Sequence, residues 1–465
     1  MSTTVDIDPT LLQELRTFRL KKSSSKTAAA VVKIDKKKLL MVMDEIYDST
    51  TLDELVEELP EHSPRFIVLS YELHHEHGRI SYVIDIRDGE LSDTILRERL
   101  GSDEGPWNHT FRLEHKLGPR LKVTALIDPS KERAEKVLET KRNSFVLSAY
   151  KDTVVYPSAQ AYIADLKPEL HPHVIWVGSP PAYRGSMAPG HDLERVLTDI
   201  LPGVPLFIEK PVATGPVEDA FEVADMLINS GNLVSVGYML RYLKVVQKMK
   251  QILDENNLEV MSVNARYIMA YEQTAKLDWW DKSQNPGPIV EQATHFCDLC
   301  RYFAGEVDLD SVSAHALEYN EPAGKLSKIP FDESLIKPEN RIPRITAATW
   351  KFETGAVGSL THAVALQGHN YSTELDLYAD GHMLRLVDPY NNPVLYFRRP
   401  GDDHEEIVRY PNDDPFFSEV SNLIDCIEHG PNAAPILSSY EDATKTYALT
   451  WAIRMASERS TKKVA

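Results

Sequence analysis

Residues 205–211, with the sequence PLFIEKP, combine a short apolar strand with a charged turn that contains Glu209, Lys210 and Pro211. The strand is predicted over Pro205–Ile208, because an apolar run without polar alternation is typical of a strand buried on both faces. Parallel sheets bind ligands at the edge where the carboxyl ends of their strands meet. The segment therefore predicts a parallel sheet that presents Lys210 at a ligand-binding edge.

Elements of the same kind precede this segment. We predict an apolar strand over Leu121–Ile127, a helix over Lys131–Lys141 and another strand over Val174–Val177. Apolar strands that alternate with helices imply parallel units covered on both faces. Residues 121–240 are therefore expected to form one α/β domain.

After Gly237 the strands lengthen and alternate apolar with polar residues, which favours a mixed or antiparallel open sheet. The strands predicted there are Met261–Tyr267, Ile345–Phe352, Gly358–Ala365 and Thr373–Tyr378. Two amphipathic helices, Phe416–Glu428 and Tyr440–Glu458, are expected to close the chain. Residues 241–465 form this second predicted domain.

Residues 1–100 form a further predicted domain, and residues 101–120 a junction that opens with glycine, acidic residues and proline. Its best-defined strands are Arg65–Tyr71 and Ile80–Ile86. The other elements predicted there are a helix from Pro9 to Arg16, strands Ala28–Ile34 and Leu39–Met43, and helices Asp53–Leu59 and Leu91–Leu100. The chain is thus predicted to be an α/β and α+β multidomain protein.

The 465 residues carry 51 basic and 70 acidic side chains, a net charge of -19, which argues against nucleic acid or an anionic membrane as partner. Three cysteines and an N-terminus without an apolar core favour a reducing cytoplasm. Basic residues nevertheless cluster between Arg16 and Lys38. This cluster is either a contact for an acidic protein partner or a solvated face.

The first hundred residues resemble the glia maturation factor branch of the actin-depolymerising-factor (ADF)/cofilin homology family. The resemblance rests on Phe18-Arg19, Lys21, Lys22, Lys33-Ile34-Asp35, Leu59-Pro60-Glu61, Pro64-Arg65-Phe66, Ser70-Tyr71, residues 78–88 and the segment Leu91–Leu100. Family members carry a further strand and a long helix where Tyr82 here runs directly into Val83. The resemblance implies a shortened domain that contacts actin or the branched-actin nucleating complex through Arg19, Lys21, Lys22 and Lys33. The alternative is a partial domain that binds nothing.

The remaining three quarters of the chain resemble the Gfo/Idh/MocA oxidoreductases. The residues that carry this resemblance are Glu209-Lys210-Pro211, residues 237–242 (GYMLRY), residues 287–291 (GPIVE), His295, Asp298 and Gly305. The resemblance implies a Rossmann-like NAD(P)-binding domain, a substrate and oligomerisation domain, and action on a sugar, an inositol or a related small hydroxylated compound. It also implies that Tyr238, Arg241, Lys210 and His295 contact the substrate, and that the C-terminal sheet joins copies of the chain.

Reversible alcohol oxidation needs a group that takes the hydroxyl proton, and a lysine or histidine near neutral pKa can do so. Lys210 and His295 are the candidates. Glu291 lies four residues before His295 on a predicted helix, so its carboxylate is expected to orient the imidazole. The alternatives are a histidine packed between domains and a surface lysine at a turn.

The cofactor is expected to be NAD or NADP, with NAD favoured, because Asp128 ends the strand Leu121–Ile127 where an acidic residue meets ribose hydroxyls. By resemblance, Ser179, Pro180 and Pro181 lie beside the nicotinamide ribose, and Glu209 and Lys210 complete the cofactor contacts. The family's first strand and its glycine-rich turn are missing. The junction residues 101–105, including Gly105, stand in their place.

No metal site is predicted. His74, His75 and His77 alternate faces on a hairpin and lack a fourth ligand, and Cys297 and Cys300 are expected to pack as small apolar residues. Two function classes stay open. One is an oxidoreductase with an impaired cofactor site, and the other is a cytoskeletal regulator whose oxidoreductase half has no turnover.

Overall fold

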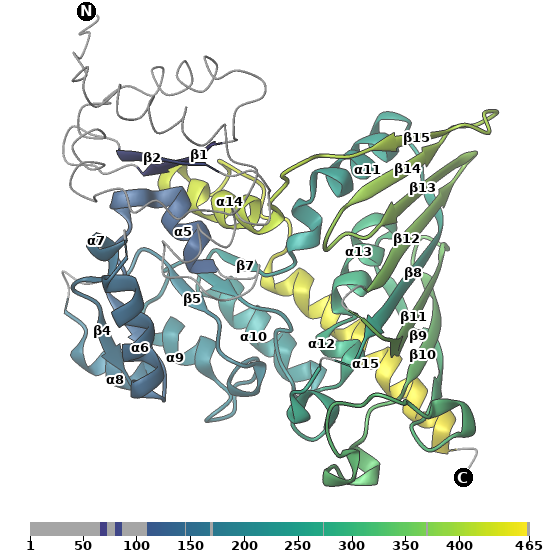
Figure 1. The fold of residues 1–465 in the computed structure, drawn as a ribbon, viewed down its shortest axis with the longest axis horizontal. Coiled ribbons are helices and arrows are strands. Elements are labelled where there is room, and N and C mark those ends of the chain that lie inside the picture. The colour runs from purple at the N-terminus through teal and green to yellow at the C-terminus, as the bar shows by residue number, and fades with distance from the viewer. Residues whose placement is uncertain are drawn as a thin grey trace, which may run out of the picture. The chain divides into compact units, whose positions relative to one another are not determined.

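The computed structural model describes residues 66–71, 80–85, 109–144, 146–167, 171–272, 274–368 and 371–462. The chain forms two compact units, residues 1–170 and 171–465, which are described separately. This division falls inside the predicted domain 121–240, and the strands that carry the Lys210 turn belong to the second unit. Figure 1 shows the elements along the chain.

The first unit contains an antiparallel pair of strands, β1 (Phe66–Tyr71) and β2 (Ile80–Asp85). Both strands match the predicted ones to within one residue. The other elements predicted for residues 1–100, the junction residue Gly105, the basic residues Arg16–Lys38 and the histidines of the hairpin lie outside the described residues.

The rest of the first unit is a two-stranded parallel sheet with helices, built around Leu121, Leu138, Val146, Ala149 and Tyr150. Its elements are α5 (His109–Leu117), β3 (Ala125–Ile127), α6 (Lys131–Arg142), α7 (Leu147–Tyr150), β4 (Val154–Tyr156) and α8 (Ala159–Asp165). The strand predicted from Leu121 begins only at Ala125. The preceding residues bond elsewhere, since the amide of Leu121 donates to the carbonyl of Gly118 and that of Val123 to the carbonyl of Ala149.

The second unit begins with a three-stranded parallel sheet in the order β5 (Ile175–Val177), β6 (Leu206–Ile208) and β7 (Val234–Val236). Helices α9 (Leu193–Ile200) and α10 (Val217–Asn229) accompany it. Every residue of β6 and β7 is buried, as the apolar run before Glu209 predicts. Among the described strands none joins β3–β4 to β5–β7, so these parallel strands form separate sheets.

The C-terminal sheet has eight strands in the order β15-β14-β13-β12-β8-β11-β10-β9. All neighbouring pairs are antiparallel except β8 and β11, which confirms the predicted mixed sheet. The strands are β8 (Val260–Ala270), β9 (Val307–Leu317), β10 (Ile345–Phe352), β11 (Val357–Leu366), β12 (Ser372–Ala379), β13 (His382–Val387), β14 (Val394–Arg398) and β15 (Glu405–Val408). Strand β10 alternates buried with exposed residues, so one face of the sheet faces solvent.

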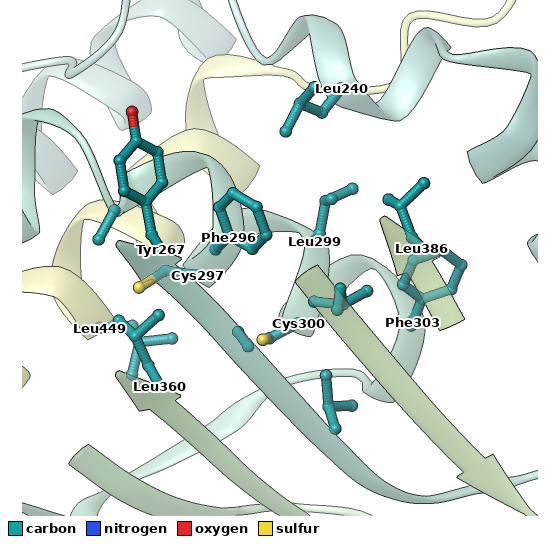
Figure 2. Packing of buried hydrophobic residues seen from close by; sticks show 14 of the residues in the cluster. Leu240, Tyr267, Phe296, Cys297, Leu299, Cys300, Phe303, Leu360, Leu386 and Leu449 are labelled. Atoms are coloured by element: carbon teal, nitrogen blue, oxygen red, sulfur yellow. The ribbon is translucent and has the colours of Figure 1, made fainter. Parts of the chain in front are cut away.

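Helices pack on the buried face of this sheet (Figure 1). They are α11 (Lys244–Glu255), α13 (Thr294–Ala304) and α15 (Tyr440–Lys462). Helix α12 (Pro288–Glu291) packs on α13 and α15, and α14 (Pro415–His429) contacts the short helix η4 (Met239–Tyr242). On α13, Cys297 and Cys300 lie among apolar side chains such as Leu449 and Leu360 (Figure 2). Both thiols are free and buried, as expected of small apolar residues.

No helix in the described ranges is both long and apolar enough to cross a membrane.

Candidate active site

Lys210 lies directly after β6, at the carboxyl edge of the parallel sheet, as predicted. Its backbone amide donates to Oε2 of Glu209 at 3.1 Å. Its ammonium group donates to the backbone carbonyl of Glu291 at 2.8 Å and to Oε1 of the same residue at 3.2 Å. The side chain keeps 18% of its surface exposed. Lys210 is therefore a half-buried, ion-paired lysine rather than a free surface lysine at a turn.

Glu291, the last residue of α12, connects Lys210 to an aromatic side chain. The indole of Trp279, in the short helix η5 (Leu277–Trp280), donates to Oε2 of Glu291 at 3.2 Å. Burial alone would raise the pKa of Glu291, but the charge of Lys210 and the hydrogen bonds from Trp279 and Lys210 outweigh it and lower that pKa. The carboxylate thus stays ionised and forms an ion pair with Lys210.

His295 is buried beside this pair but is not oriented by Glu291. Helix α12 ends at Glu291 and α13 begins at Thr294, so the prediction of one continuous helix with both side chains on one face is wrong. The carboxylate of Glu291 instead bonds Lys210 and Trp279. Burial and the nearby charge of Lys210 lower the pKa of His295 well below its usual value, and its Nδ1 has no hydrogen-bond partner within the described ranges. A neutral imidazole therefore lies next to a charged lysine.

Aromatic residues and a second histidine complete the cluster, and sequence reasoning did not find them. His362, on β11, approaches Oε1 of Gln292 at 2.9 Å and stacks on Tyr267 with ring centroids 5.4 Å apart. Tyr390 packs against both Tyr267 and His295. The sequence contains one signal for His362. It is a polar residue at a position where the alternation of β11 puts apolar residues, and the structure shows that position to be buried.

Acid is expected to destabilise the protein through His362, whose pKa burial lowers to about 4 although Glu291 opposes the shift. The unfolded imidazole binds its proton at a pKa of about 6.5. The contribution of His362 to the free energy of unfolding is therefore fully present above pH 6.5. It is lost as the pH falls to about 4, by roughly 3 kcal/mol. Urea unfolding at pH 7 and pH 4.5 should show a larger loss for the wild type than for His362→Gln. Equal losses in the two proteins would refute this prediction.

Tyr238 and Arg241, predicted to contact substrate, are buried in internal contacts instead. The guanidinium of Arg241 bonds both carboxylate oxygens of Asp298, at 2.8 and 2.7 Å, and Asp442 at 2.6 Å. The hydroxyl of Tyr238 lies 2.8 Å from Oγ1 of Thr294. These contacts join η4, α13 and α15, so the geometry gives both residues a structural role.

The loop after β5 contains Ser179, Pro180 and Pro181 and is fixed by Arg184. The guanidinium of Arg184 donates to the carbonyl of Ser179 at 3.1 Å and to that of Val212 at 3.1 Å. This ties the loop after β5 to the segment that follows Lys210. The hydroxyl of Ser179 is buried and has no hydrogen-bond partner in the described part of the chain, so it is suited to bond a ribose hydroxyl.

Asp128 follows β3 in the first unit. Its carboxylate accepts bonds from Nη2 of Arg133, 2.9 Å from each oxygen, and from the amide of Ser130 at 2.7 Å. Although burial acts to raise it, the bonds from Arg133 and Ser130 lower the pKa of Asp128. An ionised carboxylate therefore stands at the end of a parallel strand, where a dinucleotide ribose binds in this type of sheet.

Two groups suit a dinucleotide, each within its own unit. In the second unit Ser179 offers a hydroxyl that has no hydrogen-bond partner among the described residues, and in the first unit Asp128 offers an anionic acceptor for ribose hydroxyls. Residues 101–105, which stand in place of the glycine-rich turn in the sequence, lie ahead of α5 and outside the described residues. Backbone amides of such a turn are the usual pyrophosphate ligands.

Helix α14 carries a group of three potential metal ligands. Asp425, Glu428 and His429 on α14 place one ligand atom each within 4.8 Å of one another. Two of these side chains are exposed, and such groups are common without an ion, so no metal site is assigned.

The fold is thus a parallel sheet with a lysine at its carboxyl edge, followed by a mixed open sheet and by helices α12 and α13, which supply an acid and a histidine. Residues 98–238 match the model of an oxidoreductase family with an NAD-binding Rossmann fold, and residues 241–382 match an oxidoreductase C-terminal domain. The chain belongs to this family, the Gfo/Idh/MocA oxidoreductases. Ahead of the oxidoreductase portion, residues 4–86 match the model of cofilin/tropomyosin-type actin-binding proteins.

Three relatives show how much of the chain is shared with other proteins. UNK4.17 of Schizosaccharomyces pombe is 48% identical over 358 residues, 77% of this chain and 88% of that protein. C12C2.04 of the same yeast is 45% identical over 352 residues, 75% of this chain and 92% of that protein. Human glia maturation factor beta is 48% identical over 77 residues, 17% of this chain and 54% of that protein. The chain thus spans about half the length of the glia maturation factors that it matches.

Solved structures share the fold. Levoglucosan dehydrogenase in complex with NADH and levoglucosan superposes with a TM-score of 0.57 at 16% identity, covering 73% of this chain and 88% of that one. UDP-N-acetylglucosamine 3-dehydrogenase from Acidithiobacillus ferrooxidans superposes with a TM-score of 0.56 at 15% identity, covering 76% of this chain and 95% of that one. At these identities the likeness concerns the fold.

Proposed function

We propose that the oxidoreductase portion interconverts an alcohol and a carbonyl on a sugar, an inositol or a related hydroxylated compound, with His295 transferring the proton and Lys210 stabilising the reacting oxygen. The observation that carries this proposal is the ion pair of Lys210 and Glu291 beside a buried, neutral His295. NAD(P), when bound, supplies the hydride acceptor or donor. Two proteins of similar fold, levoglucosan dehydrogenase and UDP-N-acetylglucosamine 3-dehydrogenase, carry names of sugar dehydrogenases, which supports this substrate class.

The charge states suggest how the two side chains divide the work. Lys210, ion-paired with Glu291, donates a hydrogen bond to the reacting oxygen and stabilises negative charge that develops there. His295, held neutral by burial, takes the hydroxyl proton during oxidation and returns it during reduction. Assay of the purified chain with polyols, recorded as NADH formation, tests this function.

We propose NAD as the preferred dinucleotide. The carboxylate of Asp128 accepts hydrogen bonds from ribose hydroxyls but repels a 2′-phosphate. Asp128→Ser should lower the dissociation constant of NADP relative to that of NAD by about tenfold. The substitution removes the repulsion and leaves Arg133 free to bind a phosphate. Calorimetric titration of both nucleotides measures the ratio. A wild-type protein that binds NADPH tenfold more tightly than NADH would refute the preference.

For the cofilin-type portion we propose an actin-related partner in the cytoplasm, the branched-actin nucleating complex, contacted through the basic residues Arg19, Lys21, Lys22 and Lys33. Support comes from the match of residues 4–86 and from the identity with glia maturation factor. Co-sedimentation of the full chain with the purified complex and with actin filaments tests this partner.

A second proposal is that copies of the chain form a homo-oligomer through the open face of the C-terminal sheet. Light scattering of the purified chain tests this proposal.

A further inference from the structure

The Lys210–Glu291 cluster holds one described cation, and that cation is already neutralised. The ammonium of Lys210 lies 3.2 Å from Oε1 of Glu291 and keeps only 18% of its surface exposed. A carboxylate or phosphate on the substrate would therefore have to compete with Glu291 for the same positive charge. Sites that recognise anions instead present arginine or lysine groups that no protein carboxylate already occupies.

The remaining groups around this pair carry no positive charge. Burial keeps the imidazoles of His295 and His362 neutral. Tyr267, Tyr371 and Tyr390 are phenols whose pKa values rise through burial and, to a smaller extent, through the charge of Glu291. Glu209, whose carboxylate accepts the amide of Lys210, adds a further acid to the neighbourhood.

Other cations on the surrounding elements have carboxylate partners of their own. The pairs are Arg241 with Asp298 and Asp442, Arg344 with Glu333, Lys282 with Glu458, and Lys328 with Glu272. Arg184, beside the Ser179 loop, is buried and donates to the carbonyls of Ser179 and Val212. Lys276 is exposed, three residues before Trp279. Among the described side chains that bond the carboxylate of Glu291, Lys210 is thus the one cation, and its charge is already paired.

The side chains that are present suit an uncharged polyol. Trp279, Tyr371 and Tyr390 offer aromatic surface to the carbon–hydrogen faces of a ring. Gln292, Glu291 and the histidines offer hydrogen-bond donors and acceptors to hydroxyl groups. Resting on the proposed oxidoreductase function, we infer that the substrate is an uncharged polyol or sugar, and that sugar acids and sugar phosphates are excluded.

The experiment compares compounds that differ only by an anionic group, in the full-length chain with NAD+ or NADH. The sets are D-glucose with D-glucuronate and D-glucose 6-phosphate, and myo-inositol with myo-inositol 1-phosphate. The neutral member should exceed its anionic partners by at least about 100-fold in kcat/KM. An anionic member turned over as well as or better than the neutral one would overturn the inference and leave the oxidoreductase function standing. A different outcome is that calorimetry detects binding of a neutral member but not of its anionic partners, and that no compound is turned over. In that case the inference about substrate charge survives and the proposed function fails.

A charge-adding variant gives a second readout. Tyr371→Lys places an ammonium group beside the cluster and should raise the ratio of anionic to neutral kcat/KM about tenfold. Tyr378→Lys is the matched control, because Tyr378 lies on the exposed face of β12 and is 37% exposed. Its ratio should equal that of the wild type. A ratio that Tyr371→Lys leaves unchanged, or that both variants raise equally, would contradict the inference.

Discussion

Lys210→Met should lower kcat by at least about 1000-fold while the protein stays folded, because it removes the charge that stabilises the reacting oxygen. The methionine has a similar length and fits a half-buried position, and Glu291 keeps its bond from Trp279. Turnover is measured with the best substrate found, and folding by circular dichroism and urea unfolding.

Lys282→Met is the matched control for that variant. Lys282 is ion-paired with Glu458 and is 16% exposed, close to the 18% of Lys210, but its partner lies on α15. We expect this variant to keep turnover within about twofold of the wild type, since neither partner belongs to the cluster. A Lys210→Met protein with unchanged turnover would remove Lys210 from the reaction.

Arg241→Met should destabilise the protein by about 3 to 5 kcal/mol, because it leaves buried carboxylates without their partner. Arg241 is 3% exposed and bonds Asp298 and Asp442. The double variant Arg241→Met with Asp298→Leu should recover part of the loss, since it removes one uncompensated charge. Urea unfolding measures both, with the exposed, paired Arg399→Met as a control expected to cost less than about 1 kcal/mol.

This variant also separates the two roles considered for Arg241. A substrate contact would raise KM and leave the free energy of unfolding unchanged, whereas the structural role lowers that free energy. An Arg241→Met protein as stable as the wild type, with a raised KM, would restore the role in substrate binding that the sequence predicts.

The elements predicted most accurately are those with a strong local pattern. The apolar run before Glu209 gives β6 exactly where its buried residues lie, and the alternation in Ile345–Phe352 gives β10 with the same bounds. Strand β3 is shorter than predicted because Val123 bonds Ala149 across the chain, a contact that the local pattern does not contain. The break between α12 and α13 was missed, since no proline or glycine marks it.

The candidate site was predicted in part. Lys210, Glu291 and His295 were found because short motifs surround them, and the structure brings the first two into contact over 81 residues of chain. Trp279, His362 and Tyr390 join them only through the folding of the C-terminal sheet, which no local pattern reports. The burial of Arg241 could not be predicted for the same reason, because its partners Asp298 and Asp442 come from distant parts of the chain.

The first strand and glycine-rich turn, predicted from the sequence to be missing, have the most direct consequence for function. Residues 101–105, which stand in place of that turn in the sequence, lie outside the described residues. Ser179 and the Lys210 segment are the residues that we propose to contact the nicotinamide end. We therefore expect a dinucleotide to bind, but with the loss of the amide contacts that usually hold its phosphates.

Calorimetric titration of the full 465-residue chain with NADH tests this account most directly. We predict saturable binding with a Kd of about 0.1 to 1 mM, against the micromolar values that an intact phosphate turn supports. Hydrogen exchange should slow at Ser179 and around Lys210 and should stay unchanged at residues 101–105. A Kd of about 1 μM or tighter, with slowed exchange at residues 101–105, would contradict it and show that the junction is a working phosphate loop.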